Sequence, residues 1–220
     1  MSPTYCNSRQ NVFDAYGYAR TFKIHRNAYN YRGILAYLKM PTNRGVSSKN
    51  DYLNWYVGFD DVNGRKVEAG ISYTKKYNDN NIPECRKFLN YSGGGNGVSI
   101  YNERMTNQPS PGDIIKIKLV KSNSDSYGNC SVSLYIADNL VTTESLVIND
   151  LVNVKLVHGT EGNVCKYFDA QFQNAKYQIS NGSWYNWTAG YIPFPDTGDY
   201  VDPIVVDSEI NPMKTHTPNQ

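Results

Sequence analysis

Short stretches in which apolar and polar residues alternate recur along most of the chain. Ile115, Ile117 and Leu119 alternate with isoleucine or lysine, and Val132 and Leu134 alternate with serine. A period of two places every second side chain on the same face of a β-strand. The pattern predicts strands at residues 19–25, 32–40, 54–60, 66–73, 97–103, 113–120, 130–137, 144–150, 153–158 and 168–179.

The clearest local signal is the stretch at residues 54–73, where two alternating segments flank Asn63 and Gly64. Asn-Gly readily takes the two positive φ angles of a type I′ turn, which matches the twist of paired antiparallel strands. The stretch therefore predicts a β-hairpin closed by a type I′ turn.

Turn-forming residues separate the other segments, as in the Pro-Thr-Asn-Arg-Gly stretch at 41–45 and the Pro-Ser-Pro-Gly-Asp stretch at 109–113. About ten short strands with frequent turns are typical of two packed antiparallel sheets. We therefore expect an all-β jelly-roll sandwich. One short helix is expected at residues 10–19.

The chain divides by composition into three parts. Residues 1–17 form an N-terminal segment, residues 18–179 form the predicted sandwich domain, and residues 180–220 form an arm rich in proline and aromatic residues. Prolines interrupt regular structure, but so many aromatic residues are unusual in a disordered tail. We expect the C-terminal arm to pack on the sandwich or on a neighbouring subunit.

Charge and hydropathy exclude several classes of partner. The formal net charge is +2, from 22 basic and 20 acidic residues, and basic residues are scattered. Such a chain lacks the field that draws proteins to nucleic acid or to anionic membranes. No apolar run is long enough to span a bilayer, and the N-terminus lacks the features of a signal peptide. We expect an extracellular or cell-surface protein if the chain has been processed, with a cytoplasmic inclusion as the alternative.

Cysteine and acidic residues give no recognisable metal or cofactor site. Cys6, Cys85, Cys130 and Cys165 are too widely spaced for a zinc site, and the sequence leaves open whether they form disulfides or stay free. Two clusters of oxygen ligands, at 60–63 and at 196–202, do not match a known calcium loop, and turns are rich in such residues for backbone reasons. We expect no metal and no cofactor.

Candidates for acid–base catalysis are few. Glu68 would need a second acid on the same face, and Glu103 and Asp169 are the candidates by strand context. The simpler interpretation is that Glu68 is solvated. His158 follows an apolar segment and is expected at a strand end, and no serine lies in a nucleophile elbow.

The 19 tyrosines and 3 tryptophans suggest a different role for the surface. An aromatic face offers the C–H groups of a sugar an apolar platform, while nearby polar groups bind its hydroxyls. The alternation puts Trp55 and Tyr56 on opposite faces, so one of the two belongs to the core. Tyr56 and Tyr135 are further candidates, and the residues expected to bind ligand are Trp55, Tyr73, Tyr101, Trp184 and Trp187.

The succession NWYVGFDD, VEAGISYTKKYN, PGDIIKIKL, CSVSLYI and FDAQFQNAKYQI, over residues 18–179, resembles the concanavalin A-like jelly-roll sandwich. More narrowly, the Pro-Gly turn and the closing strand are similar to the secreted bacterial proteins called YrpD-like. These motifs are architectural, and what they imply is the fold.

The same layout also resembles the fungal glutamic peptidases. Their Trp-x-Gly hairpin and Gln-x-Gly strand are similar to residues 55–58 followed by 68–70. The resemblance implies that Glu68 stands where that family has its catalytic Gln. The catalytic Glu of the family would lie on the strand at 152–157, which contains Asn153 and Lys155 but no acid. Half of the catalytic pair is missing.

We therefore expect a non-enzymatic, lectin-like protein that binds a glycan or another cell-surface polymer through an aromatic sheet face. The alternative is a self-assembling structural protein, such as a fibre, coat or inclusion subunit, in which the C-terminal arm docks on the next copy. A peptidase-like hydrolase is the third and weakest interpretation.

Overall fold

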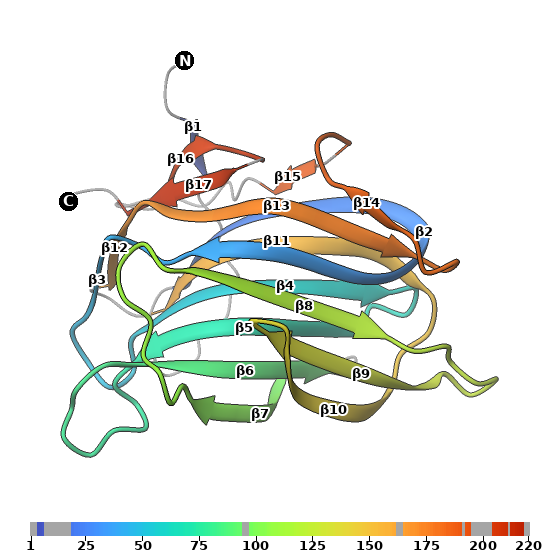
Figure 1. Ribbon diagram of the computed structural model, residues 1–220, viewed down its shortest axis with the longest axis horizontal. Helices are drawn as coiled ribbons and strands as arrows, with labels where there is room; N and C mark the ends of the chain where they lie inside the picture. The colour runs from blue at the N-terminus through green and yellow to red at the C-terminus, as the bar shows by residue number, and fades with distance from the viewer. Residues whose placement is uncertain are drawn as a thin grey trace.

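The computed structural model describes residues 4–6, 19–93, 97–161, 165–190, 192–194, 204–210 and 212–217. Within these ranges the protein consists of strands and loops and contains no helix (Figure 1). No helix in the described part is therefore long and apolar enough to cross a bilayer. The helix expected at 10–19 lies outside these ranges, except for Ala19, which begins a strand.

Two antiparallel sheets face each other. The first, called the β4 sheet, contains in order β15 (Ile192–Phe194), the first half of β2 (Ala19–Lys39), β11 (Leu151–Glu161), β4 (Tyr52–Asp61), β5 (Lys66–Thr74), β6 (Glu84–Ser92) and β7 (Val98–Arg104).

The second, called the β8 sheet, contains in order β10 (Asn139–Val147), β9 (Asn129–Ile136), β8 (Ile114–Lys121), the second half of β2, β13 (Ala170–Ile179), β17 (Met213–His216), β16 (Ile204–Ser208) and β1 (Thr4–Cys6). β14 (Trp184–Asn186) also pairs with β13, and β3 (Asn43–Val46) forms a separate small sheet with β12 (Cys165–Phe168).

Strand β2 belongs to both sheets. Its first half pairs with β11, and its second half pairs with β8 and β13. The change occurs at Asn30, whose φ of 72° lies in the left-handed region that asparagine tolerates better than most residues. The next residue, Tyr31, is in register with both Leu151 and Ile179. This strand therefore fixes how the two sheets are joined.

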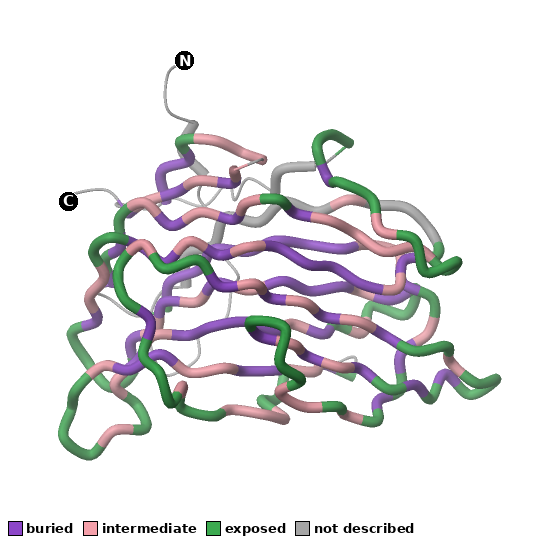
Figure 2. Tube along the Cα trace, viewed as in Figure 1, coloured by how far each residue is buried: buried purple, intermediate pink, exposed green. Residues whose placement is uncertain are grey.

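The core lies between the sheets and follows the alternation in the sequence (Figure 2). On β4, Leu53, Trp55, Val57 and Phe59 are fully buried. On β8 and β9 the alternating apolar positions are also buried: Ile115, Ile117, Leu119, Cys130, Val132, Leu134 and Ile136. The predicted all-β jelly-roll sandwich is confirmed.

The hairpin predicted at residues 54–73 is confirmed as β4 and β5, but its turn is not type I′. Only Gly64 has a positive φ, of 75°. The carboxylate of Asp61 instead accepts the backbone N–H groups of Asn63 and Arg65, each at 2.9 Å, and that of Asn149 at 3.0 Å. The buried carboxylate therefore sets the geometry of the turn and ties it to the loop before β11.

Several strands were not predicted, among them β1, the β3–β12 pair, β6 and the strands of the C-terminal arm. β6 is buried in pairs of residues rather than alternately, so it shows no period of two. In the predicted C-terminal arm, β14 pairs with β13, and β16 and β17 extend the β8 sheet. The described parts of the arm are thus strands of the sandwich. Contact with a second copy stays a prediction.

The sequence suggested that His158 lies at a strand end, but the structure places it in the core. Its side chain is fully buried between the two sheets, and its Nδ1 lies 2.7 Å from Thr215 Oγ1, which in turn lies 2.6 Å from the hydroxyl of Tyr167. The ring also packs 4.9 Å from the ring of Phe172. Burial lowers the pKa of His158 to about 3, so this residue is a neutral packing element and not a base.

Replacing Asp61 with alanine should lower the free energy of unfolding by about 3 kcal/mol, because three backbone donors lose a charged acceptor. Urea denaturation measures the change. Asp79→Ala, at an exposed position, is the matched control and should change stability by less than about 0.5 kcal/mol. Equal effects of the two substitutions would show that the Asp61 network is dispensable.

The wild-type protein should lose stability on acidification through His158. The pKa of His158 in the folded state, about 3, is below its ordinary value of 6.5. Between pH 3 and pH 6.5 the unfolded chain therefore binds a proton at this residue and the folded chain does not. The cost is about 1.4 kcal/mol per pH unit. His158→Gln should therefore show a shallower fall in unfolding free energy from pH 6.5 to 4, measured by urea denaturation. An unchanged slope would contradict a neutral, buried His158.

Candidate functional site on the outer face of the β4 sheet

Charged side chains gather on the face of the β4 sheet that points away from the core. Because core and outer positions alternate, β4 presents Tyr56 and Asp60 on this outer face, β5 presents Glu68, and β11 presents Lys155. Gly58 is in register with both Glu68 and Lys155. Three adjacent strands thus bring two acids and one base together.

Lys155 is the centre of this group. Its Nζ lies 2.6 Å from Glu68 Oε1 and 2.9 Å from Asp60 Oδ1, and its side chain is only 3% exposed. The side chain occupies the space that Gly58 leaves free, since a Cβ at Gly58 would lie 2.8 Å from Lys155 Cε. The side chain of Lys155 therefore fits here because Gly58 has no side chain.

Asp60 is held on both of its carboxylate oxygens. Oδ1 accepts from Lys155, and Oδ2 accepts from Asn153 Nδ2 at 2.8 Å. Burial would raise the pKa of Asp60, but Lys155 and Asn153 outweigh it and lower the pKa. Burial likewise opposes the charge of Lys155, yet Glu68 and Asp60 raise its pKa. With two carboxylates and one ammonium group, the formal charge of the Asp60–Lys155–Glu68 cluster is about −1.

Glu68 is the member of the cluster that faces solvent. Its side chain is 27% exposed, against 16% for Asp60, and its Oε1 contacts Lys155. Its Oε2 has no hydrogen-bond partner within the described part of the chain. Glu68 thus has an oriented acceptor on a partly exposed side chain.

An aromatic pair lies next to the cluster. The rings of Tyr56 and Phe88 meet edge to face, with centroids 5.9 Å apart. Gly70 is in register with both residues. Its surroundings leave no room for a side chain at this position, because a Cβ would lie 2.6 Å from Tyr56 Cα. Burial and the nearby Glu68 raise the pKa of Tyr56 well above its ordinary value, so its hydroxyl stays protonated.

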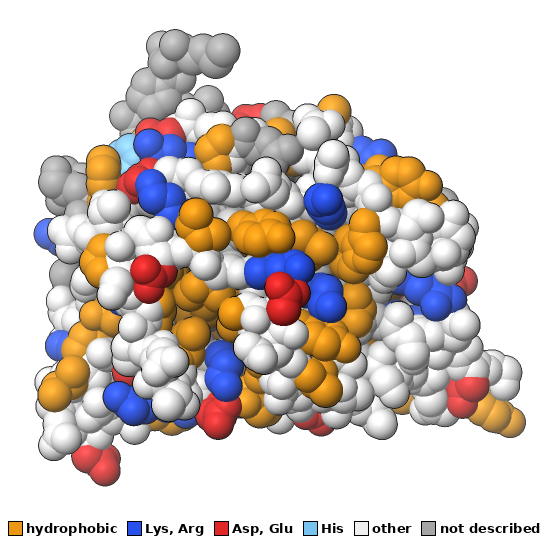
Figure 3. Space-filling model, in the orientation of Figure 1, with side chains coloured by type: hydrophobic (Ala, Val, Ile, Leu, Met, Phe, Trp, Pro, Cys, Tyr) orange, Lys and Arg blue, Asp and Glu red, His pale blue; other side chains and the backbone are white. Residues whose placement is uncertain are grey.

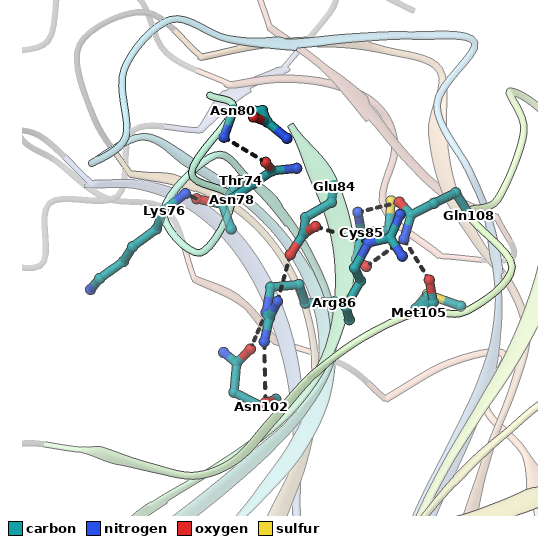
Figure 4. Close-up of polar contacts among 11 residues, drawn as sticks. Thr74, Lys76, Asn78, Asn80, Glu84, Cys85, Arg86, Asn102, Met105 and Gln108 are labelled. Carbon is teal, nitrogen blue, oxygen red and sulfur yellow. Dashed lines mark hydrogen bonds and ion pairs between the residues drawn. The ribbon is translucent and has the colours of Figure 1, made fainter. Parts of the chain in front are cut away.

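A second ion cluster lies farther along the same face, on β6 and β7. Arg86 contacts the buried carboxylate of Glu84 and the side chain of Asn102 (Figure 4). Arg104 Nε lies 3.0 Å from Glu84 Oε2. The guanidinium of Arg86 also lies 4.3 Å from the centre of the Tyr77 ring. With two arginines and one glutamate, this cluster carries a net charge of about +1.

The outer face of the β8 sheet is different. Apolar and basic side chains gather in its middle, with a few acidic side chains beside them (Figure 3). Lys118 Nζ lies 3.7 Å from the centre of the Tyr135 ring, and Lys116 pairs with Asp138 at 2.7 Å. The lysine covers one face of Tyr135, which leaves less of this ring available as a sugar platform.

The structure does not gather the predicted ligand-binding residues into one surface. Trp55 and Trp187 are fully buried, so neither is available to stack on a ligand. The ring of Trp55 instead packs edge-on against Tyr167, at 6.0 Å. Trp55 is thus the core member of the Trp55 and Tyr56 pair.

The other three predicted residues lie apart from one another. Tyr73 is half-buried on β5 beneath the guanidinium of Arg44, which lies 4.9 Å from its ring centre. Tyr101 is half-buried on β7 and donates to Glu103. Trp184, on β14, is half-buried beside β13 of the other sheet. A role for these three in binding stays a prediction.

The partner of Glu68 was misassigned from the sequence. Glu103 pairs with Lys87, and Asp169 pairs with Lys39 and Lys214. The nearby acid is Asp60, which the sequence had suggested only as a calcium ligand. Its outer-face position follows from the alternation on β4, but its contact with Lys155 depends on a strand about 95 residues away.

Cysteines and metal-ligating groups add no further site in the described ranges. Cys85, Cys130 and Cys165 are buried, and Cys85 and Cys130 form no disulfide within the described ranges. No group of three or more His, Cys, Asp or Glu residues in the described ranges is arranged to hold a metal ion. The second candidate calcium cluster, at 196–202, lies outside them.

Comparison with known proteins shows a similarity of fold. No family model and no curated protein sequence matches the chain. Two solved structures of scytalido-glutamic peptidase, bound to transition-state analogues, align over 90% of this chain and 97% of theirs, with a TM-score of 0.51 and identities of 11% and 13%. Carbohydrate-binding module CBM66 from Bacillus subtilis aligns over 74% of this chain and 90% of its own, with 11% identity and a TM-score of 0.41.

The peptidase alignments confirm the concanavalin A-like fold and correct one expectation. The aligned peptidases are enzymes with this fold, so the expectation of a non-enzymatic protein is overturned. Glu68, at the position compared with the catalytic Gln of the peptidases, forms an ion pair with Lys155, which lies on the strand expected to carry their catalytic Glu. The similarity to YrpD-like proteins stays a prediction.

Lys155→Met should destabilise the protein by about 3–5 kcal/mol at pH 7, because it leaves two partly buried carboxylates without a cation. Their mutual repulsion raises their pKa values, so acidification neutralises them in the variant. In the wild type, folding lowers the pKa of Asp60, so its ionised carboxylate stabilises the fold at pH values above the ordinary pKa of an aspartate. This contribution is lost as the pH falls through the pKa of the folded state.

The stability difference between wild type and Lys155→Met should therefore narrow from pH 7 to pH 4, measured by urea denaturation at each pH. Lys49→Met, which removes a charge from an exposed position, is the matched control and should show a small, constant difference. A Lys155→Met deficit that stays constant or widens in acid would contradict a buried ion cluster.

Proposed function

We propose that the outer face of the β4 sheet binds a carbohydrate chain, with Glu68 as the central hydrogen-bond acceptor. The observation that carries this proposal is the partly exposed carboxylate of Glu68, whose Oε1 is fixed by the buried Lys155 while its Oε2 has no hydrogen-bond partner within the described part of the chain. An oriented acceptor loses little entropy when it binds a hydroxyl group. Carboxylate and amide groups are the partners that sugar hydroxyls need.

The neutrality of the face favours a hydroxyl-rich ligand over a charged one. Both ion clusters are paired internally, and their net charges of about −1 and +1 cancel. A strongly charged polymer would find little net attraction, whereas hydroxyl groups can bond to the remaining lone pairs and N–H groups. The partly buried ring of Tyr56 lies between the clusters and offers an apolar surface for a sugar ring.

The spacing of the clusters suggests an oligosaccharide rather than a single sugar. Glu68 belongs to the first cluster, and Ser72, four residues along β5, is in register with Arg86 of the second. Four residues of strand correspond to about 13 Å. A ligand that contacts both clusters must therefore be extended along the strands.

Hydrolysis of the bound chain is a second candidate, favoured by one observation. Asp60 and Glu68 contact the same Lys155 Nζ, so two carboxylates lie close together, as hydrolysis of a glycosidic bond requires. The lowered pKa of Asp60 keeps it ionised and suits a base or nucleophile better than an acid. The proton donor would then have to be Glu68.

A glycan array followed by calorimetry with the best oligosaccharide tests the binding proposal. Glu68→Gln should weaken binding at least tenfold, because a hydrogen bond to a charged group is worth about 1.5–3 kcal/mol. Tyr56→Ala should weaken it as well. Chromatography of the incubated oligosaccharide shows whether the chain is also cleaved.

Glu103→Gln is the matched control, since this exposed carboxylate lies on β7 but contacts Lys87 and Tyr101 instead of the cluster. It should bind as the wild type does. An array without any ligand, or a Glu68→Gln variant with wild-type affinity, would refute the proposed site.

A further inference from the structure

A cavity of about 430 Å³ lies at the end of the sandwich where β2 passes from one sheet to the other, on the right in Figure 1. Its walls come from the bend of β2, the β4–β5 turn, the loop after β8, the loop before β11 and the end of β13. Volumes of this size are typical of small-molecule sites. The cavity shares no residue with the outer-face clusters of the β4 sheet.

Two cations line this end cavity without a carboxylate partner. Lys121 occupies a core-facing position at the end of β8 and is only 9% exposed. Its Nζ donates to the backbone oxygen of Ser122 at 3.3 Å, and it forms no ion pair within the described ranges. Arg32, on β2, likewise has no ion pair or side-chain hydrogen bond to any residue that the structure describes.

The nearby acids are mostly engaged elsewhere. Asp125 accepts hydrogen bonds from the backbone N–H groups of Tyr127 and Asn129 at 2.8 and 2.9 Å. The carboxylate of Asp61 accepts backbone N–H groups of the β4–β5 turn. Asp150 lines the cavity but is exposed and forms no ion pair with Lys121. Burial is the main cause of the lowered pKa of Lys121. Cys130, Asp150 and Asp61 oppose this shift without cancelling it, and the positive charge of Arg32 acts in the same direction as burial.

A nearly buried ammonium group beside an unpaired guanidinium is unfavourable, because a charge removed from water costs several kcal/mol unless it is paired. An oxyanion would remove this penalty for both groups. The planar N–H fork of arginine matches the geometry of a carboxylate or a phosphate, and the ammonium of lysine adds a point charge.

We propose that the end cavity binds a small polar ligand bearing a carboxylate or phosphate group, with Lys121 and Arg32 holding the oxyanion. Asn123 and Ser180, also in the wall, offer an amide and a hydroxyl to the body of the ligand. The volume admits a molecule the size of a sugar acid or a sugar phosphate.

Calorimetry on the full chain at fixed ionic strength tests this site with four probes: galacturonate, glucose 6-phosphate, inorganic phosphate and neutral galactose. The anions should bind at least tenfold more tightly than galactose. Lys121→Met and Arg32→Gln should each weaken anion binding at least tenfold. Binding of inorganic phosphate alone would still support the oxyanion site and would identify a free anion as its ligand.

Three controls make the result specific. Lys49→Met removes one charge outside the cavity and should leave binding unchanged. Ser180→Trp keeps both cations but obstructs the cavity and should abolish binding, which separates a cavity from diffuse attraction. Glu68→Gln should have no effect, so that failure of the carbohydrate proposal and failure of this one are distinguishable.

Thermal unfolding of each variant checks its fold. If Lys121→Met does not fold, Arg32→Gln and Ser180→Trp decide the question, because both positions are less buried. Equal affinity for galactose and galacturonate, no binding of any anion, or wild-type binding by folded cation variants would overturn the proposal.

Discussion

The structure depends on one strand that two sheets share. β2 pairs with β11 before Asn30, and with β8 and β13 after it, so one segment sets the register of three other strands. A register slip of one residue would turn every side chain of a strand to the opposite face. A single continuous strand therefore links the placement of apolar residues in both sheets, and the positive φ of Asn30 allows it to change partners.

The shared strand also determines what the outer faces can hold. With the apolar positions directed inward, the intervening positions of β4, β5 and β11 are free to carry charged groups, and the register brings Lys155 beside Gly58. A lysine so deeply buried is tolerated because two carboxylates surround it and because glycine leaves space for its side chain. Packing on one face and electrostatics on the other follow from the same register.

The two candidate sites use charge in opposite ways. On the outer face of the β4 sheet, the charges are paired, and the free lone pair of Glu68 is the feature available to a ligand. In the end cavity, Lys121 and Arg32 are not paired within the described ranges, and the missing partner is itself the indication of a ligand. The first arrangement suits a neutral, hydroxyl-rich chain, and the second suits a small anion. The fold, shared with peptidases, is compatible with chemistry at the first site.

The sequence by itself determined the all-β class, most of the strands and the hairpin around Gly64, because period-two alternation and turn residues are local properties. It did not reveal β6, which is buried in pairs of residues, nor the turn geometry, which the buried carboxylate of Asp61 sets. Only the tertiary structure decided that Trp55 is core and that Asp60 joins Glu68 through Lys155. These contacts depend on which strands, far apart in the sequence, become neighbours in the sheet. Alternation predicts that a residue faces outward, but it does not predict which side chains that residue contacts.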